Sequence, residues 1–311
     1  TFQQKLSASD ALANDYFGAS VAISGDTIVI GASQDDIGAN ANQGSAYVFT
    51  RSSGVWTQQA KLTANNGTGY NSFGASVAIS GDTIAVTSPG DVGYSVFPNS
   101  IYIFTREGIV WTQQQQLVIG GSGSSYYNDG NIPTGLSLSG GILAVGLYNY
   151  RNGSTSYSGA VAIFTLTGST WSEQTKIFNS DIAVNTAFGS SISLSGNTLA
   201  VGASLRDEPG QADQGAVYLF TTNGSTWTQQ AKILAADGLA GDRFGVSVSL
   251  LGDTLLVGAN GDDFPQIIGS FNDQGSVYVF KRSGSTWTQY AKFSDVSGAD
   301  SDNFGASVVL T

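Results

Sequence analysis

The side chains able to do chemistry in this 311-residue chain are almost all carboxylates. It has 23 Asp and Glu against 12 Lys and Arg, a net charge of −11, and neither His nor Cys. A Ser-His-Asp triad, a thiolate nucleophile and the usual zinc sites are therefore excluded. A pair of carboxylates, as in glycosidases, is the enzyme chemistry that is left. The acidic charge also argues against nucleic acid and anionic membranes as partners.

Eight of the aspartates fall in pairs on segments rich in Asn, Gly and Ser. Calcium prefers about six to eight oxygen ligands, so two such segments together are candidates for holding it. The alternative is that Asp and Asn cap turns and keep the surface soluble. Because the positions recur along the chain, which a single active site would not need, we expect no catalysis and no required cofactor, with calcium as the one candidate ion. The pairs are Asp10 with Asp15, Asp35 with Asp36, Asp237 with Asp242, and Asp262 with Asp263.

A group of tyrosines near the middle of the chain is the second candidate site. An exposed Tyr ring packs flat on a ligand while its hydroxyl forms a hydrogen bond, which suits a glycan or a protein partner. Alternatively, these rings cover a gap in an irregular part of the fold. The residues concerned are Tyr126, Tyr127, Asp129, Tyr148, Tyr150, Arg151 and Tyr157.

Both candidate sites belong to a sequence that repeats itself. The segment at 17–36, FGASVAISGDTIVIGASQDD, returns almost unchanged at 73–91 as FGASVAISGDTIAVTSPGD. A degraded copy without Phe-Gly follows at 133–150 and contains part of the tyrosine group. Self-similarity at a period of 55 to 60 residues predicts a repeat architecture. Further copies begin at Phe188, Phe244 and, truncated, Phe304, and the same period separates Trp56, Trp111, Trp171, Trp227 and Trp287.

Each copy is expected to form four short strands. In the first copy, 17–24 alternates apolar and small residues, an SGD hairpin turn follows, and 27–32 and 45–50 are apolar on both faces, as in buried strands. The segment 56–62 is polar on one side and contains Lys61, which is typical of an edge strand. The sequence therefore predicts a single all-β domain over 1–311, a β-propeller of four-stranded antiparallel blades. We expect five complete blades and a sixth made from both termini, with five or seven blades as alternatives.

Two short motifs connect the chain with a known family. Phe-Gly opens the copies, and Gly-Ala closes the second strand at 31–32, 202–203 and 258–259. In these motifs the whole chain resembles the FG-GAP propellers of integrin α-subunits, and more closely their bacterial secreted or surface relatives. The resemblance implies an extracellular or cell-surface location. Integrin propellers often have a calcium loop between strands one and two, but this chain has only short SGD or SGN turns there, so Asp26, Asp82 and Asp253 are expected to be turn residues.

Strand alternation separates two kinds of loop. The turns between strands one and two and between three and four are short, whereas the 2-3 and 4-1 loops are long, variable and acidic, and lie together at the other end of the strands. Variable loops on a rigid scaffold are where binding sites usually lie. We therefore expect a non-enzymatic binding or adhesion module that recognises a protein or carbohydrate through this rim. The alternatives are a structural unit that assembles with copies of itself or with neighbouring domains, and a carboxylate-dependent glycosidase.

The two ends of the chain each carry one isolated strand motif. Residues 2–6 resemble a fourth strand and residues 304–311 a first strand. The chain is therefore expected to be a segment of a longer one, or to assemble with a neighbour through the incomplete blade. No apolar run reaches the roughly 18 residues of a membrane-spanning helix, so membrane insertion is not expected.

Overall fold

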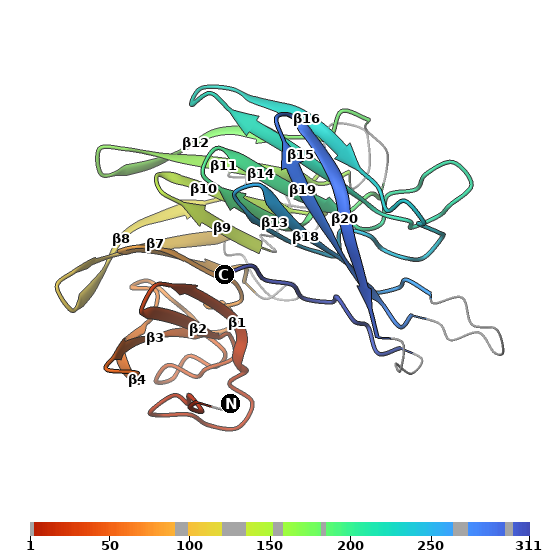
Figure 1. The fold of residues 1–311 in the computed structure, drawn as a ribbon. Coiled ribbons are helices and arrows are strands. Elements are labelled where there is room, and N and C mark those ends of the chain that lie inside the picture. The colour runs from red at the N-terminus through yellow and green to blue at the C-terminus, as the bar shows by residue number, and fades with distance from the viewer. Residues whose placement is uncertain are drawn as a thin grey trace. The chain divides into compact units, whose positions relative to one another are not determined.

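The computed structural model describes residues 3–90, 99–119, 135–151, 158–181, 185–263, 273–295 and 301–311. In these residues the chain is all β, with twenty strands in five four-stranded antiparallel sheets (Figure 1). Each sheet comes from one copy of the repeat, and its strands follow one another in chain order. The predicted β-propeller fold with five complete blades is confirmed.

The strand bounds follow the sequence pattern closely. The first two sheets are β1 (Phe17–Ser24), β2 (Thr27–Ala32), β3 (Ser45–Ser52), β4 (Val55–Leu62), and β5 (Val77–Ser80), β6 (Thr83–Ser88), β7 (Ser100–Glu107), β8 (Val110–Val118). The third is β9 (Gly135–Ser139), β10 (Ile142–Leu147), β11 (Ala160–Thr167), β12 (Thr170–Ile177). The last two are β13 (Phe188–Ser195), β14 (Thr198–Ala203), β15 (Ala216–Thr222), β16 (Trp227–Ile233), and β17 (Ser247–Leu251), β18 (Thr254–Ala259), β19 (Ser276–Ser283), β20 (Thr286–Ser294).

The chain divides into two compact units. The first contains residues 1–143 and 164–173, and the second contains 144–163 and 174–311. Sheets β1–β4 and β5–β8 belong to the first unit, and β13–β16 and β17–β20 to the second. Within the first unit β5 packs beside β1 and β9, and within the second β17 packs beside β13 and β14.

Each unit has its core between facing sheets. In the first unit, Val29 and Val48 of one sheet pack with Val77, Ile84 and Val86 of the next. In the second unit the equivalent residues of β15, β17 and β18 form the same kind of core. The second and third strands are buried almost throughout, as their apolar sequences predict, because each has a neighbour on both faces.

The Phe-Gly and Gly-Ala motifs join one blade to the next. Phe73 is fully buried and packs edge to face against Phe104 of its own blade, with ring centroids 6.0 Å apart. The next residue, Gly74, runs so close to Gly31 of the preceding blade that a Cβ on Gly31 would lie 2.0 Å from the Gly74 carbonyl oxygen. Ser20 Oγ donates a hydrogen bond to this oxygen at 2.8 Å. Only glycine at position 31 leaves room for this contact. The second unit repeats the joint with Gly202, Gly245 and Ser191, and with Gly258, Gly305 and Ser247.

The second copy departs from the motif at the point where its neighbour does. Thr87 stands where the first copy has Gly31, and the copy that follows lacks Phe-Gly. Thr87 Oγ1 accepts a hydrogen bond from the Ser76 backbone N–H at 2.8 Å. The second copy thus lacks the counterpart of Gly31, and the copy that follows lacks the Phe-Gly that would pack against it.

The terminal segments occupy the places of blade strands without being assigned as strands in the described residues. The Gln4 side chain bonds both the backbone N–H and the carbonyl of Trp56, at 3.0 and 2.8 Å, as Gln115 does with Trp171. At the other end Phe304 bridges Gly275, the same pairing that Phe73 makes with Gly44. A sixth blade built from these segments, and the number of blades in the ring, stay predictions. In the described part of the chain, no helix is long and apolar enough to cross a membrane.

Candidate binding rim

The 2-3 and 4-1 loops form a connected surface within each unit, which we call the rim. In the first unit it comprises residues 7–16, 33–44 and 63–72. Backbone hydrogen bonds fix these loops to one another: Gln34 N–H donates to the Asp15 carbonyl at 3.2 Å, and Tyr70 N–H donates to the Ala41 carbonyl at 2.7 Å. In the second unit the Gly241 N–H donates to Ala212 in the same way. Backbone hydrogen bonds therefore fix these loops to one another in both units.

A lysine on the fourth strand joins the two loops of the first copy. Lys61 Nζ lies 2.6 Å from Asp10 of the 4-1 loop and 2.8 Å from Asp35 of the 2-3 loop. The Tyr47 hydroxyl, with its one proton, lies within hydrogen-bond distance of the same two carboxylates, at 2.8 and 3.0 Å. Burial raises the pKa of Tyr47 to about 12, so the hydroxyl stays a donor. Burial lowers the pKa of Lys61, but its hydrogen bonds to Asp10 and Asp35 outweigh this effect and raise that pKa above its usual range.

The fifth copy repeats this arrangement. Lys292 Nζ lies 2.8 Å from Asp237 and 2.7 Å from Asp262, and the Tyr278 hydroxyl donates to Asp237 at 3.0 Å. The buried Asp262 also accepts a hydrogen bond from the Ser276 hydroxyl. Two carboxylates, a lysine and a tyrosine thus form the same cluster in both units.

The second and fourth copies change the charges in the described part of this cluster. In the second copy Asn66 accepts from the Tyr102 hydroxyl and donates to Gln116, which stands in the place of Lys61. In the fourth copy Arg206 takes the place of Asp35. It lies 3.0 Å from Asp181, which also binds Lys232 at 2.8 Å. In the described residues, the cluster thus becomes neutral at Asn66 and Gln116 in the second copy and a longer chain of alternating charges in the fourth.

The acidic pairs suggested by the sequence are rearranged in space. Asp10 meets Asp35 through Lys61, and Asp237 meets Asp262 through Lys292. The other four each accept a backbone N–H in their own loop: Asp15 from Leu12, Asp36 from Asn42, Asp242 from Leu239 and Asp263 from Asp273, at 2.7 to 2.8 Å.

Calcium binding by these loops stays a prediction. The described residues contain no group of three or more acidic side chains that could hold a metal ion. An ion at the paired carboxylates would also have to displace the lysine ammonium. Comparison of melting temperatures in millimolar calcium and in EDTA tests the prediction.

The tyrosine group is only partly described. Tyr126, Tyr127, Asp129 and Tyr157 lie outside the described residues. Tyr148 is exposed, whereas Tyr150 and Arg151 are half-buried.

Tyr150 occupies the place that Asp35 has in the first copy. Its backbone N–H donates to Leu147 at 3.0 Å and its carbonyl accepts from Gly159. The third strand of this copy has Ala162 where the first copy has Tyr47, and the Tyr150 ring lies 5.9 Å from the Lys176 ammonium, much as Tyr47 lies beside Lys61. Its centroid is also 5.9 Å from that of Phe178. This packing favours the interpretation that Tyr150 covers a gap left by the degraded repeat, which stays a prediction.

The structure also shows rim residues that the sequence interpretation missed. Leu12 is 73% exposed and Tyr16 is 63% exposed on the 4-1 loop of the first copy, and Tyr70 is exposed on the next. Tyr16 has a positive φ of 55°, an uncommon conformation for a bulky residue. The equivalent residues Ser72, Ala187, Arg243 and Asn303 have the same positive φ. The fold thus fixes the backbone conformation at the position before Phe-Gly, while the residue type varies from copy to copy. Alignment of the copies would have shown this variation.

Five antiparallel four-stranded sheets from successive copies, with variable loops at one end of the strands, define this chain as a β-propeller repeat protein. The family model of the FG-GAP repeat matches residues 1–49, 56–104, 171–220 and 227–280, more than half of the chain. The chain therefore belongs to the FG-GAP repeat family. No curated protein matches it.

Two solved structures are similar at low sequence identity. The crystal structure of the GH74 enzyme of Niastella koreensis has a TM-score of 0.47 and 18% identity, over 87% of this chain and 38% of that one. The N-terminal domain of Nup159 has a TM-score of 0.43 and 12% identity, over 87% of this chain and 60% of that domain. The chain spans less than two thirds of the length of either protein.

Proposed function

We propose that this propeller is a non-enzymatic binding module of the cell surface or extracellular space, and that it recognises a protein partner through the rim of its first unit. The observation that carries the proposal is the exposure of Leu12, Tyr16 and Tyr70 on loops whose backbones are fixed by hydrogen bonds. Tyr is enriched among the residues that dominate protein interfaces, and a rigid loop loses little conformational freedom on binding. The aliphatic Leu12 favours a protein partner over a glycan.

The charge arrangement on the rim supports binding rather than catalysis. A glycosidase needs one carboxylic acid that keeps its proton near neutral pH and a second carboxylate beside it. Asp10 does not fit this role, because its hydrogen bond with Lys61 lowers the pKa of its carboxyl group. Burial raises the pKa of Asp242, but this carboxyl group is 1% exposed and accepts the Leu239 N–H, so it does not face a ligand. Asp35 shares the same lysine and also accepts a hydrogen bond from Tyr47. These carboxylates are used to hold two loops together.

The surface location rests on family membership and on the sequence. The FG-GAP repeat resemblance extends to secreted and surface proteins, and the chain is rich in Ser, Thr, Asn and Gly with little charge. The proposed location does not depend on the geometry of the rim.

An array of purified extracellular-matrix proteins, with a glycan array beside it, tests the proposed function. We expect the wild-type chain to bind at least one protein, and Tyr16→Ala and Leu12→Ala each to weaken this binding by about 2 kcal/mol while leaving the melting temperature unchanged. Ile109→Ala is the matched control, because Ile109 is equally exposed but lies on a turn between strands three and four, at the other end of the blade. Binding to glycans alone, or an equal loss in the control, would contradict the proposal.

A further inference from the structure

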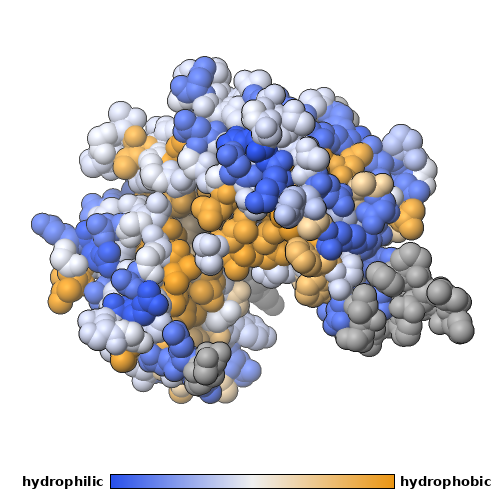
Figure 2. All heavy atoms as spheres, viewed as in Figure 1, coloured by the Kyte–Doolittle hydropathy of each residue, from blue (hydrophilic) through white to orange (hydrophobic). Residues whose placement is uncertain are grey.

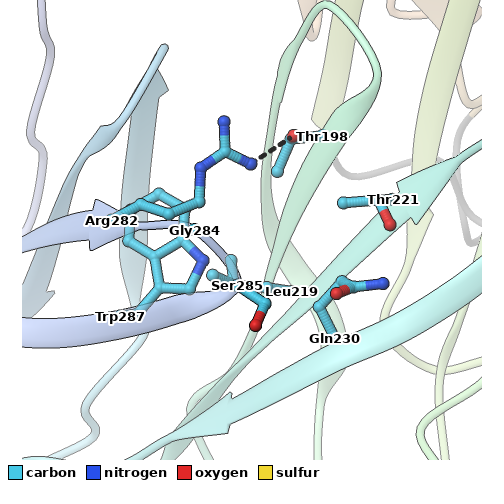
Figure 3. Close-up of a pocket in the computed structure, with 8 residues that line it drawn as sticks. All are labelled: Thr198, Leu219, Thr221, Gln230, Arg282, Gly284, Ser285 and Trp287. Carbon is cyan, nitrogen blue, oxygen red and sulfur yellow. Dashed lines mark hydrogen bonds between the residues drawn. The ribbon is translucent and has the colours of Figure 1, made fainter.

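A pocket of about 190 Å³ lies in the second unit, near the turns between strands three and four (Figure 3). These turns are at the opposite end of the blades from the 2-3 and 4-1 loops. Pockets for drug-sized ligands measure roughly 300–1,000 Å³, so this one suits a smaller ligand of about one ring. Its walls come from β14–β16 of one blade and from β19, β20 and their turn in the next: Thr198, Leu219, Thr221, Gln230, Arg282, Gly284, Ser285 and Trp287.

Arg282 is fixed and neutralised at the edge of the pocket. Its Nε lies 2.7 Å from Asp253, and a terminal nitrogen donates to the Thr198 hydroxyl at 3.2 Å (Figure 3). Its guanidinium also lies over the Trp287 ring, 5.4 Å from the centroid. The arginine therefore holds the indole in place and brings no uncompensated charge to the pocket.

The first unit contains equivalent residues with one additional hydrogen bond. There Arg106 contacts Asp82, Thr27 and the Trp111 ring in the same way. In that unit Trp111 Nε1 donates a hydrogen bond to Gln59 Oε1 at 2.9 Å.

In the second unit this hydrogen bond is absent. Gln230, the counterpart of Gln59, is exposed, and Trp287 Nε1 has no hydrogen-bond partner among the described residues. Figure 3 shows the indole nitrogen on the side of the ring that faces Thr221 and Gln230. Ser285 also stands where the first unit has the larger Ile109. The Trp287 indole N–H, which has no partner among the described residues, thus faces a pocket lined by hydroxyl and amide groups.

We propose that this pocket binds a single neutral sugar ring. The indole N–H, the hydroxyls of Thr198 and Thr221 and the Gln230 amide can each bond a hydroxyl of the ligand. A small anion would use the same donors, but Asp253 already neutralises Arg282 and the chain has a net charge of −11. A neutral polyhydroxyl ring therefore fits the pocket better than an anion. The inference is independent of the rim.

Titration of the ¹⁵N-labelled chain followed by NMR tests the inference. The probes are glucose, galactose, mannose and N-acetylglucosamine, with sodium acetate as the anion, and Trp287→Phe assigns the indole signal. We expect the Trp287 indole signal to shift saturably with at least one sugar, and the Trp111 signal to stay unchanged because its N–H is already bonded. No saturable shift with any sugar, or a shift with acetate alone, would overturn the proposal.

A second variant separates loss of binding from loss of folding. Ser285→Ile places in the pocket the residue that the first unit has at this turn, so folding should be preserved. We expect it to weaken sugar binding by at least about tenfold, the equivalent of roughly one hydrogen bond. The control is Ile109→Ser in the first unit, for which binding should equal that of the wild type. Unchanged affinity in a folded Ser285→Ile variant would show that the sugar binds elsewhere.

Discussion

At the scale of single residues, the charged groups of this propeller change in sets from copy to copy. Three copies pair the aspartate of the first turn with an arginine near the end of the third strand: Asp26 with Arg51, Asp82 with Arg106 and Asp253 with Arg282, at 2.6 to 2.7 Å. The third copy has Gly141 and Leu166 at the two positions, and the fourth has Asn197 and Thr222. The backbone hydrogen bond between the two positions is the same in all five copies. The aspartate thus persists only where its partner does.

Asp242 gives a prediction about the pH dependence of stability. This carboxyl group is 1% exposed, and burial, with a further contribution from Asp262 and Asp263, raises its pKa from 3.8 to about 7. Between these two values the folded state holds a proton that the unfolded state has lost, so the free energy of unfolding falls as the pH rises through this window, by about 1.4 kcal/mol for each unit of pKa shift at most. Above the window this loss of stability is complete.

The variant Asp242→Asn should remove that loss. Its free energy of unfolding should match that of the wild type near about pH 4 and exceed it near about pH 8, measured by urea denaturation at both values. An amide fits the position, because Asn71 at the same place in the second copy accepts the Thr68 N–H at 2.6 Å. If the free energies of unfolding of variant and wild type differed by the same amount at both pH values, the raised pKa of Asp242 would be contradicted.

The two described tyrosines of the third copy should respond differently to truncation. Tyr150→Ala removes a half-buried ring that packs on Phe178 and Lys176, and should lower the free energy of unfolding by about 1–3 kcal/mol. Tyr148→Ala removes an exposed ring and should change it by less than about 0.5 kcal/mol. Thermal and urea denaturation of both variants measure the difference. Similar small effects for both would mean that Tyr150 does not cover the degraded repeat.

At the scale of elements, the joint between blades depends on glycine at the end of the second strand. Gly31→Ala would place a Cβ 2.0 Å from the Gly74 carbonyl oxygen and 2.3 Å from Ser20 Oγ. Because the first contact is with backbone, side-chain rotation cannot relieve it, and we expect a loss of about 2–4 kcal/mol in urea denaturation. Gly141→Ala is the control, since its Cβ would lie 3.5 Å from Leu166 Cβ, an ordinary contact. Equal stability of the two variants would show that the joint adjusts freely.

The strands were predictable because their signals are local and occur five times. Alternation in 17–24, the SGD turn and the apolar second and third strands place β1 to β3 correctly without any long-range information. The acidic cluster was not predictable in this way. The meeting of Asp10 with Asp35 depends on two loops and on Lys61, which lies opposite Tyr47 in the register of β3 and β4. The role of Tyr150 likewise depends on a small residue, Ala162, on a different strand.

At the scale of the whole molecule, one interface between neighbouring copies occurs in both units. Between the first and second copies, and between the fourth and fifth, one face of a sheet packs on the opposite face of the next, as Val29 and Val48 do with Val77 and Ile79. The same interface explains the burial of Leu62 on β4 and of Ile233 on β16. A chain built from one repeated interface carries, on its first and last blades, surfaces that are complementary by construction.

These complementary surfaces lead to a prediction about assembly. Val21 and Ile23 of β1 are 58% and 51% exposed, whereas the equivalent Val77 and Ile79 are 6% and 8% exposed. Figure 2 shows apolar side chains exposed over the part of the first unit that contains β1. In the second unit, Phe293 of β20 is 57% exposed although its counterpart Leu62 is buried. Each surface resembles one side of the joint between blades. The Val21 face of one molecule can therefore pack on the Phe293 face of a second molecule, head to tail.

We expect the chain to self-associate with increasing concentration, measured by sedimentation velocity. Val21→Asp and Phe293→Asp should each shift it toward the monomer, because a buried carboxylate without a partner opposes packing of the apolar faces. Ile109→Asp should not, since Ile109 is also exposed but lies on a turn between strands three and four rather than on a blade face. Monomeric wild type at every concentration would contradict the prediction. So would an equal effect of all three substitutions, because general surface charge would then explain the result without any repeated interface.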